Sequence, residues 1–294
     1  MVPGTVEFGM VTPNRPIRLG IVRYLNTLPL VEGLDRLAGL ELVPAVPSHL
    51  AEMLADGTVD VALASIVDAV RSPVPLAVVP CGMIGSDGPT LTVRLFSHVP
   101  AEHVTEVYAD TDSHTSVVLC QMLLQGLHGK PVKVVSFDAR ELTTGSATTE
   151  AGEWPPALLL IGDKVVTDQT PAVRYPHQLD LGEAWKTATG LPFVYAAWMC
   201  RCEDAESDRV RTATAILDRQ RRHNRTRVHW IVGERARGRR WPRDLADRYL
   251  GELLRYDMGD AERQAAGVFL SRAATMGLVP DRPLVFADPL AATV

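Results

Sequence analysis

The chain has 294 residues, of which 46% are hydrophobic and 22% charged, with a formal net charge of −5 at pH 7. This length predicts about two domains or one large one, with a core that needs no disulfide or metal. The composition excludes an intrinsically disordered protein. The apolar runs, such as residues 157–161, are far shorter than the ~18–20 residues that cross a bilayer, which excludes a membrane-spanning protein.

The N-terminus and the cysteines indicate the compartment. Residues 1–16 hold no basic stretch followed by an apolar one, so we expect no secretory signal. The four cysteines, Cys81, Cys120, Cys200 and Cys202, include no Cys-x-x-Cys pair and lack the clustering of a zinc site. The sequence therefore predicts a cytoplasmic protein with reduced thiols.

The charge is unevenly spread along the chain. Residues 219–243 contain ten arginines and one acidic residue, Glu234, for a net charge of +9, which leaves −14 for the rest. A nucleic-acid surface would need aromatic residues among the basic ones, and this segment has only Trp230 and Trp241. We expect a solvated face and no nucleic-acid partner.

The N-terminal part alternates between strand and helix signals. Strands are expected at 17–22, 40–46 and 59–64, and helices at 29–37 and 49–55, the second capped by Ser48. This order predicts a parallel sheet with right-handed crossovers. The glycines and proline at Gly82, Gly85, Gly88 and Pro89 then mark a break.

A second α/β unit follows, and then a helical tail. Strands are expected at 91–97, 104–109, 132–137, 157–162 and 193–200, and helices at 115–125, 203–222, 243–256 and 260–276. Extended segments near 90–98 and 190–200 join the two units, so we expect two lobes that close on a ligand. Lobe one would comprise residues 1–95 and 196–294, including the final helices, and lobe two residues 96–195. A single fused sheet is the alternative.

Polar residues follow the first expected strand in the segment Tyr24-Leu-Asn-Thr-Leu-Pro29. Ligands of open α/β sheets bind beside strand ends and helix N-termini. Asn26 offers an amide there and Thr27 a hydroxyl. Both residue types also cap helices, and on residue type alone capping is the favoured interpretation.

The segment Asp112-Ser-His-Thr-Ser116 opens another expected helix. Its hydroxyls, on Ser113, Thr115 and Ser116, together with the helix N-terminus, predict a carboxylate site that needs no cation, although an ordinary N-cap explains them equally well. His114 lies on the same turn, where a surface or packing role is more typical than a catalytic base.

Three further candidates stand where a cleft would open. Ser65 ends the third expected strand, Thr92 lies in the first connecting segment, and Asp163 ends an apolar strand. Each is a candidate ligand for substrate, and each residue type also bonds backbone or forms turns. The sequence lacks the motifs for nucleotide cofactors, zinc peptidases and serine hydrolases, so we expect neither cofactor nor metal.

Taken together, these segments carry a specific resemblance. Their order is Tyr24-Leu-Asn-Thr-Leu-Pro29, Gly57-Thr-Val-Asp-Val-Ala62 with Ser65, Leu91-Thr-Val-Arg-Leu-Phe-Ser97, Ser113-His-Thr-Ser116, Leu160-Ile-Gly-Asp163, Asp180-Leu-Gly-Glu-Ala-Trp185 and Thr189-Gly-Leu-Pro-Phe-Val-Tyr-Ala196. The chain resembles the chorismate dehydratase family of the futalosine route to menaquinone. The resemblance runs from about residue 17 to residue 201 and is looser in the helical tail.

The resemblance implies a two-lobed, type II periplasmic-binding-protein-like α/β fold, each lobe a mixed or parallel sheet flanked by helices, with the C-terminal helices on lobe one. It implies a cytoplasmic hydro-lyase that converts chorismate, a dianion, to 3-[(1-carboxyvinyl)oxy]benzoate and water, with no cofactor. The family's asparagine falls on Asn26 and its crossing-strand serine on Thr92, which keeps the hydroxyl and adds a methyl. Its Ser-x-Thr-Ser turn falls on Ser113, Thr115 and Ser116, and its aspartate on Asp163.

The expected site therefore has two catalytic residues, Asn26 and Thr92, and eight substrate-binding residues: Tyr24, Thr27, Ser65, Ser113, His114, Thr115, Ser116 and Asp163. The general base stays open between the substrate's own enolpyruvyl carboxylate, Asp163 and His114. Two alternatives remain. One is the dihydroxynaphthoate synthase of the same route, against which the Ser-His-Thr-Ser turn argues, and the other is a non-catalytic small-anion-binding protein of the same fold.

Overall fold

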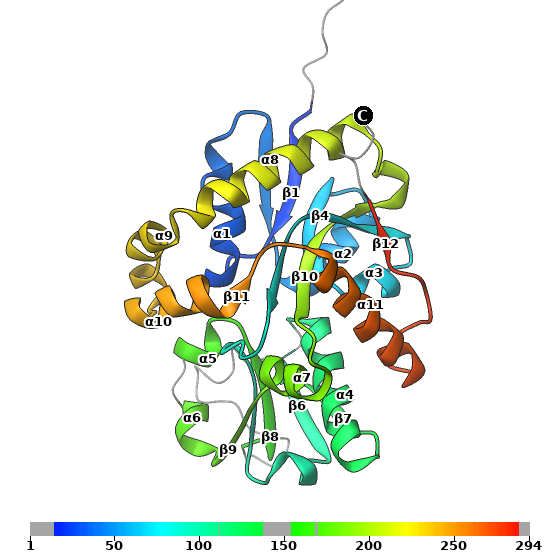
Figure 1. Cartoon of the computed structure of the whole chain (residues 1–294), viewed down its shortest axis with the longest axis vertical. Helices are drawn as coiled ribbons and strands as arrows, with labels where there is room; N and C mark the ends of the chain where they lie inside the picture. Colours follow the sequence, from blue (N-terminus) through cyan, green and yellow to red (C-terminus); the bar gives the residue numbers. More distant parts are fainter. Residues whose placement is uncertain (1–14, 111, 138–153, 168–169, 288–294) are drawn as a thin grey trace, which may run out of the picture.

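The computed structural model describes residues 15–110, 112–137, 154–167 and 170–287. The N-terminal stretch considered above for a secretory signal lies almost wholly outside these residues. Two β-sheets, each flanked by helices, lie one above the other along the long axis of the molecule (Figure 1). The protein is therefore an α/β, two-lobed molecule, as expected from the sequence.

Within the described residues, the upper lobe contains a seven-stranded sheet in the order β11-β4-β10-β3-β1-β2, with β12 paired to β4. Its strands are β1 (Ile17–Ile21), β2 (Leu40–Pro44), β3 (Val61–Ser65), β4 (Leu76–Ser86), β10 (Phe193–Arg201), β11 (Leu254–Arg255) and β12 (Val285–Phe286). β1 pairs in parallel with β2 and with β3, which confirms the expected parallel unit. β10 lies antiparallel between β3 and β4.

The lower lobe contains a five-stranded sheet in the order β7-β6-β8-β5-β9, again counted over the described part of the chain. Its strands are β5 (Val93–Ser97), β6 (Glu106–Asp110), β7 (Lys133–Phe137), β8 (Ala157–Ile161) and β9 (His177–Asp180). β6 is parallel to β7 and β8, whereas β5 is antiparallel to β8 and β9. Both sheets are thus mixed.

The helices are α1 (Leu28–Val31), α2 (Pro47–Ala55), α3 (Asp68–Arg71), α4 (His114–His128), α5 (Lys164–Thr167), α6 (Thr170–Arg174), α7 (Leu181–Thr189), α8 (Asp208–Arg225), α9 (Val228–Arg235), α10 (Arg243–Arg248) and α11 (Asp260–Thr275). α8 packs on α1 and β4, and α11 packs on β10. The C-terminal helices therefore return to the upper lobe, as expected (Figure 1). In the described part of the chain, no helix is both long and apolar enough to cross a membrane.

Two expected helices are shorter than the periodicity indicates. The helix expected at 29–37 ends at Val31, because Gly33 adopts a left-handed conformation with φ +87°. The α-helix expected at 243–256 ends at Arg248. A π-helical turn, Tyr249–Leu253, and the short strand β11 follow it. The expectation that the tail is purely helical is therefore wrong, since two-residue strands such as β11 and β12 leave no periodic signal. Ser48 is not a cap either, because α2 begins at Pro47 with Val46 as its N-cap.

The long strand β4 contains Gly82 and Gly85, two of the four residues that the sequence marks as a break, whereas Gly88 and Pro89 follow its end. It lies between β10 and β11, and its residues are nearly all buried. A Cβ at Gly85 would lie 2.4 Å from the Phe193 carbonyl oxygen, so the glycine makes room for the neighbouring strand rather than for a turn.

The chain passes between the two sheets twice. It leaves the upper sheet after Ser86 and enters the lower one at Val93, and it returns between α7 and Phe193. The first crossing is held by the Asp180 carboxylate, which accepts the N–H groups of Thr90 and Leu91 at 2.9 and 2.7 Å. Leu91 has φ +70°, a strained backbone for a branched residue. The boundaries expected from the sequence, at 95/96 and 195/196, stay predictions.

Candidate functional site

A cavity lies between the two lobes, where strands of both sheets end. Its polar lining comes from the segment after β1, the end of β3, the first crossing, the start of α4, β10 and the π-helical turn: Tyr24, Asn26, Thr27, Ser65, Thr90, Thr92, Ser113, Ser116, Tyr195 and Tyr249. Among the described residues, no arginine or lysine lines it. The cavity volume is about 60 Å³, well below the ~300–1,000 Å³ of typical ligand pockets, so the lobes are closed.

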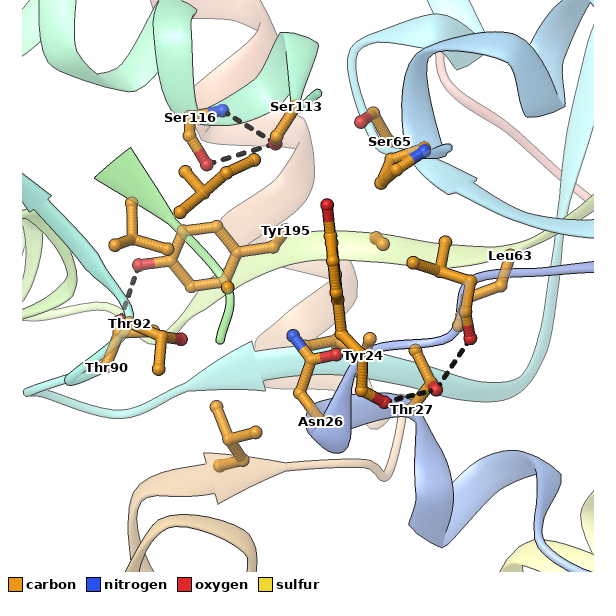
Figure 2. Close-up of a pocket in the computed structure, with 18 of the residues that line it drawn as sticks. Tyr24, Asn26, Thr27, Leu63, Ser65, Thr90, Thr92, Ser113, Ser116 and Tyr195 are labelled. Carbon is orange, nitrogen blue, oxygen red and sulfur yellow. Dashed lines mark hydrogen bonds between the residues drawn. The ribbon is translucent and has the colours of Figure 1, made fainter. Parts of the chain in front are cut away.

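Seven of the ten residues expected at the site line this cavity. They are Tyr24, Asn26, Thr27, Ser65, Thr92, Ser113 and Ser116. Figure 2 shows the Asn26 amide and the Thr90 and Thr92 side chains on one side of the space and the Ser113 and Ser116 hydroxyls on the other. Three expected residues, His114, Thr115 and Asp163, are not part of the lining.

Asn26 does not cap the helix that follows it. The short helical turn Leu25–Thr27 and α1 both start without a side-chain capping hydrogen bond, so the capping interpretation favoured from residue type is wrong. The Asn26 Oδ1 atom is buried and has no hydrogen-bond partner among the described residues. A buried amide oxygen without a partner is costly unless another group reaches it, which indicates a ligand-facing role.

The hydroxyls of Thr27 and Tyr24 are already committed to protein partners. Thr27 Oγ1 donates to the carbonyl oxygens of Val22 and Tyr24 at 2.8 and 2.9 Å, which fixes the loop after β1. Tyr24 donates to the Asp112 carboxylate at 2.8 Å. Burial, together with that carboxylate, raises the pKa of Tyr24 far above its usual value, so the phenol stays protonated.

The start of α4 presents two hydroxyls to the cavity. Ser113 is the N-cap of α4, and its Oγ accepts the Ser116 N–H at 3.3 Å and lies 3.0 Å from Ser116 Oγ (Figure 2). The capping interpretation of this turn is therefore confirmed, and the same serine lines the cavity. The carboxylate site stays a prediction. The exposed N–H groups of a helix N-terminus favour an anion at this end.

His114, Thr115 and Asp163 connect the two lobes. His114 Nδ1 lies 2.7 Å from an Asp68 carboxylate oxygen, and the Thr115 hydroxyl accepts the Val67 N–H at 3.5 Å. The hydrogen bond to Asp68 raises the pKa of His114, against an opposing effect of burial. These contacts join α4 of the lower lobe to α3 of the upper one.

The Asp163 carboxylate accepts the Leu25 N–H with both oxygens at 3.2 Å, which ties the end of β8 to the loop that carries Asn26. Burial raises its pKa above the usual value, while this hydrogen bond opposes the rise. Asp163 therefore binds the backbone of the loop that carries Asn26, and its side chain does not line the cavity.

The sequence-based site missed three hydroxyls: Thr90, Tyr195 and Tyr249. Thr90 Oγ1 lies 2.6 Å from the Tyr195 hydroxyl, and Thr92 Oγ1 lies 2.5 Å from the Tyr249 hydroxyl. Tyr195 belongs to the segment Thr189–Ala196, which is one of the motifs that carry the family resemblance, so this motif could have indicated it. Tyr249 lies in the loosely matching tail, where no local motif marks it. Among the described residues, no three His, Cys, Asp or Glu side chains gather as metal ligands.

Known proteins are similar to this chain over nearly its whole length. The family model described as "Menaquinone biosynthesis" matches residues 17–275. The chain belongs to this family. A chorismate dehydratase from Thermus thermophilus is 29% identical over 288 residues, which cover 93% of this chain and 100% of that protein.

Solved structures confirm the expected fold of this menaquinone-biosynthesis family member. A Candida albicans protein, described as having the generic periplasmic binding protein fold, matches with a TM-score of 0.64 at 9% identity, over 91% of this chain and 92% of its own. The alkanesulfonate-binding protein from Xanthomonas axonopodis, bound to MOPS, matches with a TM-score of 0.60 at 13% identity, over 92% and 96%. At these identities the likeness concerns the fold alone.

Proposed function

We propose that this protein is a chorismate dehydratase, a hydro-lyase that converts chorismate to 3-[(1-carboxyvinyl)oxy]benzoate and water. The observation that carries the proposal is the Asn26 amide, which is free of any capping role and faces a closed cavity together with Thr92. The full-length likeness to a chorismate dehydratase supports the same assignment.

The substrate's chemistry accounts for a site of neutral donors. Chorismate carries a ring carboxylate, an enolpyruvyl carboxylate and a C4 hydroxyl. Removal of the C3 proton builds a dienolate that spreads onto the ring carboxylate, and departure of the C4 hydroxyl leaves an aromatic ring. The substrate supplies that driving force, so the protein needs mainly to place hydrogen-bond donors where negative charge grows and to exclude water.

Asn26 and Thr92 are the donors that we assign to the reacting ring, as catalytic residues. The helix N-terminus at Ser113 and Ser116 is the counterpart that we assign to a substrate carboxylate, since its N–H groups favour an anion without a cation. Tyr24 and Thr27, whose hydroxyls serve protein partners, shape the loop that carries Asn26.

The base that we propose is the substrate's own enolpyruvyl carboxylate. It takes the C3 proton, and the C3–H electron pair enters the conjugated ring system. The C4–O bond then breaks as the leaving hydroxyl takes that proton back from the enolpyruvyl carboxylic acid and departs as water. Asp163 and His114 are poorly placed for this step, because both are bound to the opposite lobe and neither lines the cavity.

Separate Asp163→Asn and His114→Gln variants test the base. Both should turn over within about tenfold of wild type, far less than the loss from removing a general base, which is ~10²–10⁴-fold. A loss of that size in one variant, at unchanged melting temperature, would assign the base to that residue instead.

We also propose that the reaction needs no metal or organic cofactor and takes place in the cytoplasm. All four cysteines are free thiols, and three of them are buried, which suits a reducing compartment. Activity that survives exhaustive dialysis against a chelator, with no absorbance from a bound chromophore, would support cofactor independence.

The deciding experiment is incubation of the pure protein with chorismate, followed by mass measurement of the product. We expect a product lighter by one water molecule, with the absorbance of a substituted benzoate. Chorismate that is bound tightly but recovered unchanged would favour the small-anion-binding alternative and overturn the enzymatic assignment.

A further inference from the structure

The C-terminal tail of the chain contributes a tyrosine to the cavity wall. Tyr249 is the first residue of the π-helical turn Tyr249–Leu253, is 0% exposed and lines the cavity. π-Helical turns are rare and are found frequently at functional sites. Together with Leu254, this tyrosine makes the C-terminal helices part of the cavity wall.

The Tyr249 ring is held in one orientation. It stacks on the buried Trp241 ring with 5.0 Å between centroids and an interplanar angle of 10°. Its hydroxyl lies 2.5 Å from Thr92 Oγ1, at the short end for hydrogen-bonded hydroxyls. The stacking on Trp241 therefore fixes the position from which the Tyr249 hydroxyl contacts the Thr92 side chain.

The direction of this hydrogen bond decides what Thr92 can do. Burial raises the pKa of Tyr249, an effect that hydrogen bonding by the Thr92 and Asn26 side chains partly offsets, so the phenol keeps its proton. Either hydroxyl of the Tyr249–Thr92 pair can be the donor. A phenol is much more acidic than an aliphatic hydroxyl, so we take Tyr249 to donate to Thr92 Oγ1. The Thr92 proton is in this way left for a group in the cavity.

Thr92 is also fixed from its backbone side. The crossing that carries it is bound by Asp180 and strained at Leu91, as described above. Backbone and hydroxyl are thus constrained independently, which is the arrangement expected of a preorganised donor rather than of a surface threonine.

We propose that Tyr249 is a positioning residue of the reaction, which orients the Thr92 hydroxyl so that it donates its proton into the cavity. This proposal rests on the proposed function and deepens it. Tyr249 acts through Thr92, so it contributes to the barrier for dehydration more than to the binding of chorismate.

The competing explanation is that the Tyr249–Thr92 contact only anchors the C-terminal helices to the crossing. The two roles differ in what they change. An anchor lowers the melting temperature and leaves turnover per folded molecule untouched, whereas a positioning residue lowers kcat with KM nearly constant.

The test compares Tyr249→Phe with Tyr256→Phe by product formation from chorismate and by thermal melting. Both variants remove one buried phenol oxygen from the same stretch of chain, and the Tyr256 hydroxyl has no hydrogen-bond partner in the described residues and lines a different hollow. We expect Tyr249→Phe to lose about 10- to 100-fold in kcat with KM within about threefold. Tyr256→Phe should keep wild-type kinetics.

A double-mutant cycle with Thr92→Val gives a second readout. If Tyr249 acts through Thr92, adding Tyr249→Phe to Thr92→Val should change kcat by less than about threefold. If Tyr249→Phe fails to fold, Trp241→Leu, which loosens the stacked ring but keeps the phenol, should still lower kcat without raising KM.

The outcomes separate the two proposals. A wild-type protein that leaves chorismate unchanged overturns the proposed function and this inference with it. An active wild type with a Tyr249→Phe variant of equal kcat overturns the inference alone, as does a full additive loss in the double mutant.

Discussion

At the scale of single residues, what distinguishes the polar groups of the cavity is whether each is already bound to protein. The Thr27 hydroxyl donates to a backbone carbonyl, and the Tyr24 hydroxyl donates to a carboxylate. Asn26 has an unpartnered Oδ1, and the only described partner of the Thr92 hydroxyl is the Tyr249 hydroxyl, 2.5 Å away. We assign catalysis to Asn26 and Thr92, whereas Thr27 and Tyr24 hold the loop in place.

Asn26→Ala tests that division. If the amide stabilises the developing dienolate, its loss should lower kcat by about 10²–10³-fold, like removal of an oxyanion-hole donor. The melting temperature should change little, because no capping bond is lost. Steady-state kinetics and thermal melting of the same preparation provide the measurement. Wild-type kcat in a folded variant would refute the assignment.

At the scale of elements, α7 and the first crossing act as one unit. The Asp180 carboxylate caps α7 by accepting the N–H groups of Gly182 and Glu183, and it accepts those of Thr90 and Leu91 as well. A Cβ at Gly182 would lie 2.1 Å from Thr90 Oγ1, so only glycine allows this approach. One carboxylate thereby couples a helix start to the segment that places Thr92.

Asp180→Asn should both destabilise the protein and slow the reaction. Asparagine keeps one acceptor oxygen but places an NH₂ group opposite a backbone donor, which should cost about 1–3 kcal/mol of unfolding free energy. Because Thr92 loses its fixed backbone, kcat per folded molecule should fall as well. Urea denaturation and initial rates measure the two effects.

The matched control for Asp180→Asn is Ser207→Ala. Ser207 caps α8 by accepting the Val210 N–H at 3.2 Å, and it does not line the cavity. Its loss should cost about 0.5–2 kcal/mol and leave kcat unchanged. Equal kcat losses in both variants would mean that destabilisation alone, and not the crossing, accounts for the effect.

At the scale of the whole molecule, the lobes are drawn together around a small cavity. Contacts that cross between them include Tyr24 to Asp112, Leu25 to Asp163 and His114 to Asp68. A cavity of about 60 Å³ has no room for chorismate. We therefore expect substrate to enter a more open form, and closure to exclude water from the reaction.

Small-angle scattering tests this closure. We expect the free protein to have a larger mean radius of gyration than the protein saturated with 3-[(1-carboxyvinyl)oxy]benzoate, because bound product favours the closed form. Calorimetry on the same sample establishes that product is bound. An identical radius of gyration with bound product would argue against hinge motion.

The contact of His114 with Asp68 makes part of the stability depend on pH. The hydrogen bond raises the pKa of His114 in the folded protein above the ~6.5 of the unfolded chain. Its stabilisation is therefore fully present below about pH 6.5 and is lost as pH rises through the raised value. The nearby Arg71 acts against this rise and Glu52 supports it.

Urea denaturation of wild type and His114→Gln at pH 5.5 and 8.5 measures this contribution. Wild type should be the more stable at pH 5.5, by up to about 1 kcal/mol for a partly exposed pair, and the difference should shrink at pH 8.5. A difference that grows with pH would contradict the assignment.

Much of the candidate site could be predicted because its residues stand next to elements with a clear local signal. Asn26 follows a short, mostly apolar strand, and Ser113 precedes a long helical segment. Tyr249 could not be predicted, since its partner Thr92 is 157 residues away and only packing brings them together. The long strand β4 was missed because Gly82 and Gly85 within it, followed by Gly88 and Pro89, are residue types that are typical of turns.

The family, the parallel unit of β1, β2 and β3, and the strand ends and helix start that supply most of the cavity's polar groups could all be predicted from the amino-acid sequence. These features depend on local periodicity and on the order of short motifs, which can be recognised without knowing the tertiary contacts. The tertiary structure decided which hydroxyls are free to act, that Asp163 and His114 join the lobes instead of lining the cavity, and that the tail contributes Tyr249. Hydrogen-bond partners are chosen among all groups that packing brings within about 3 Å, and most of these pairs are distant in sequence.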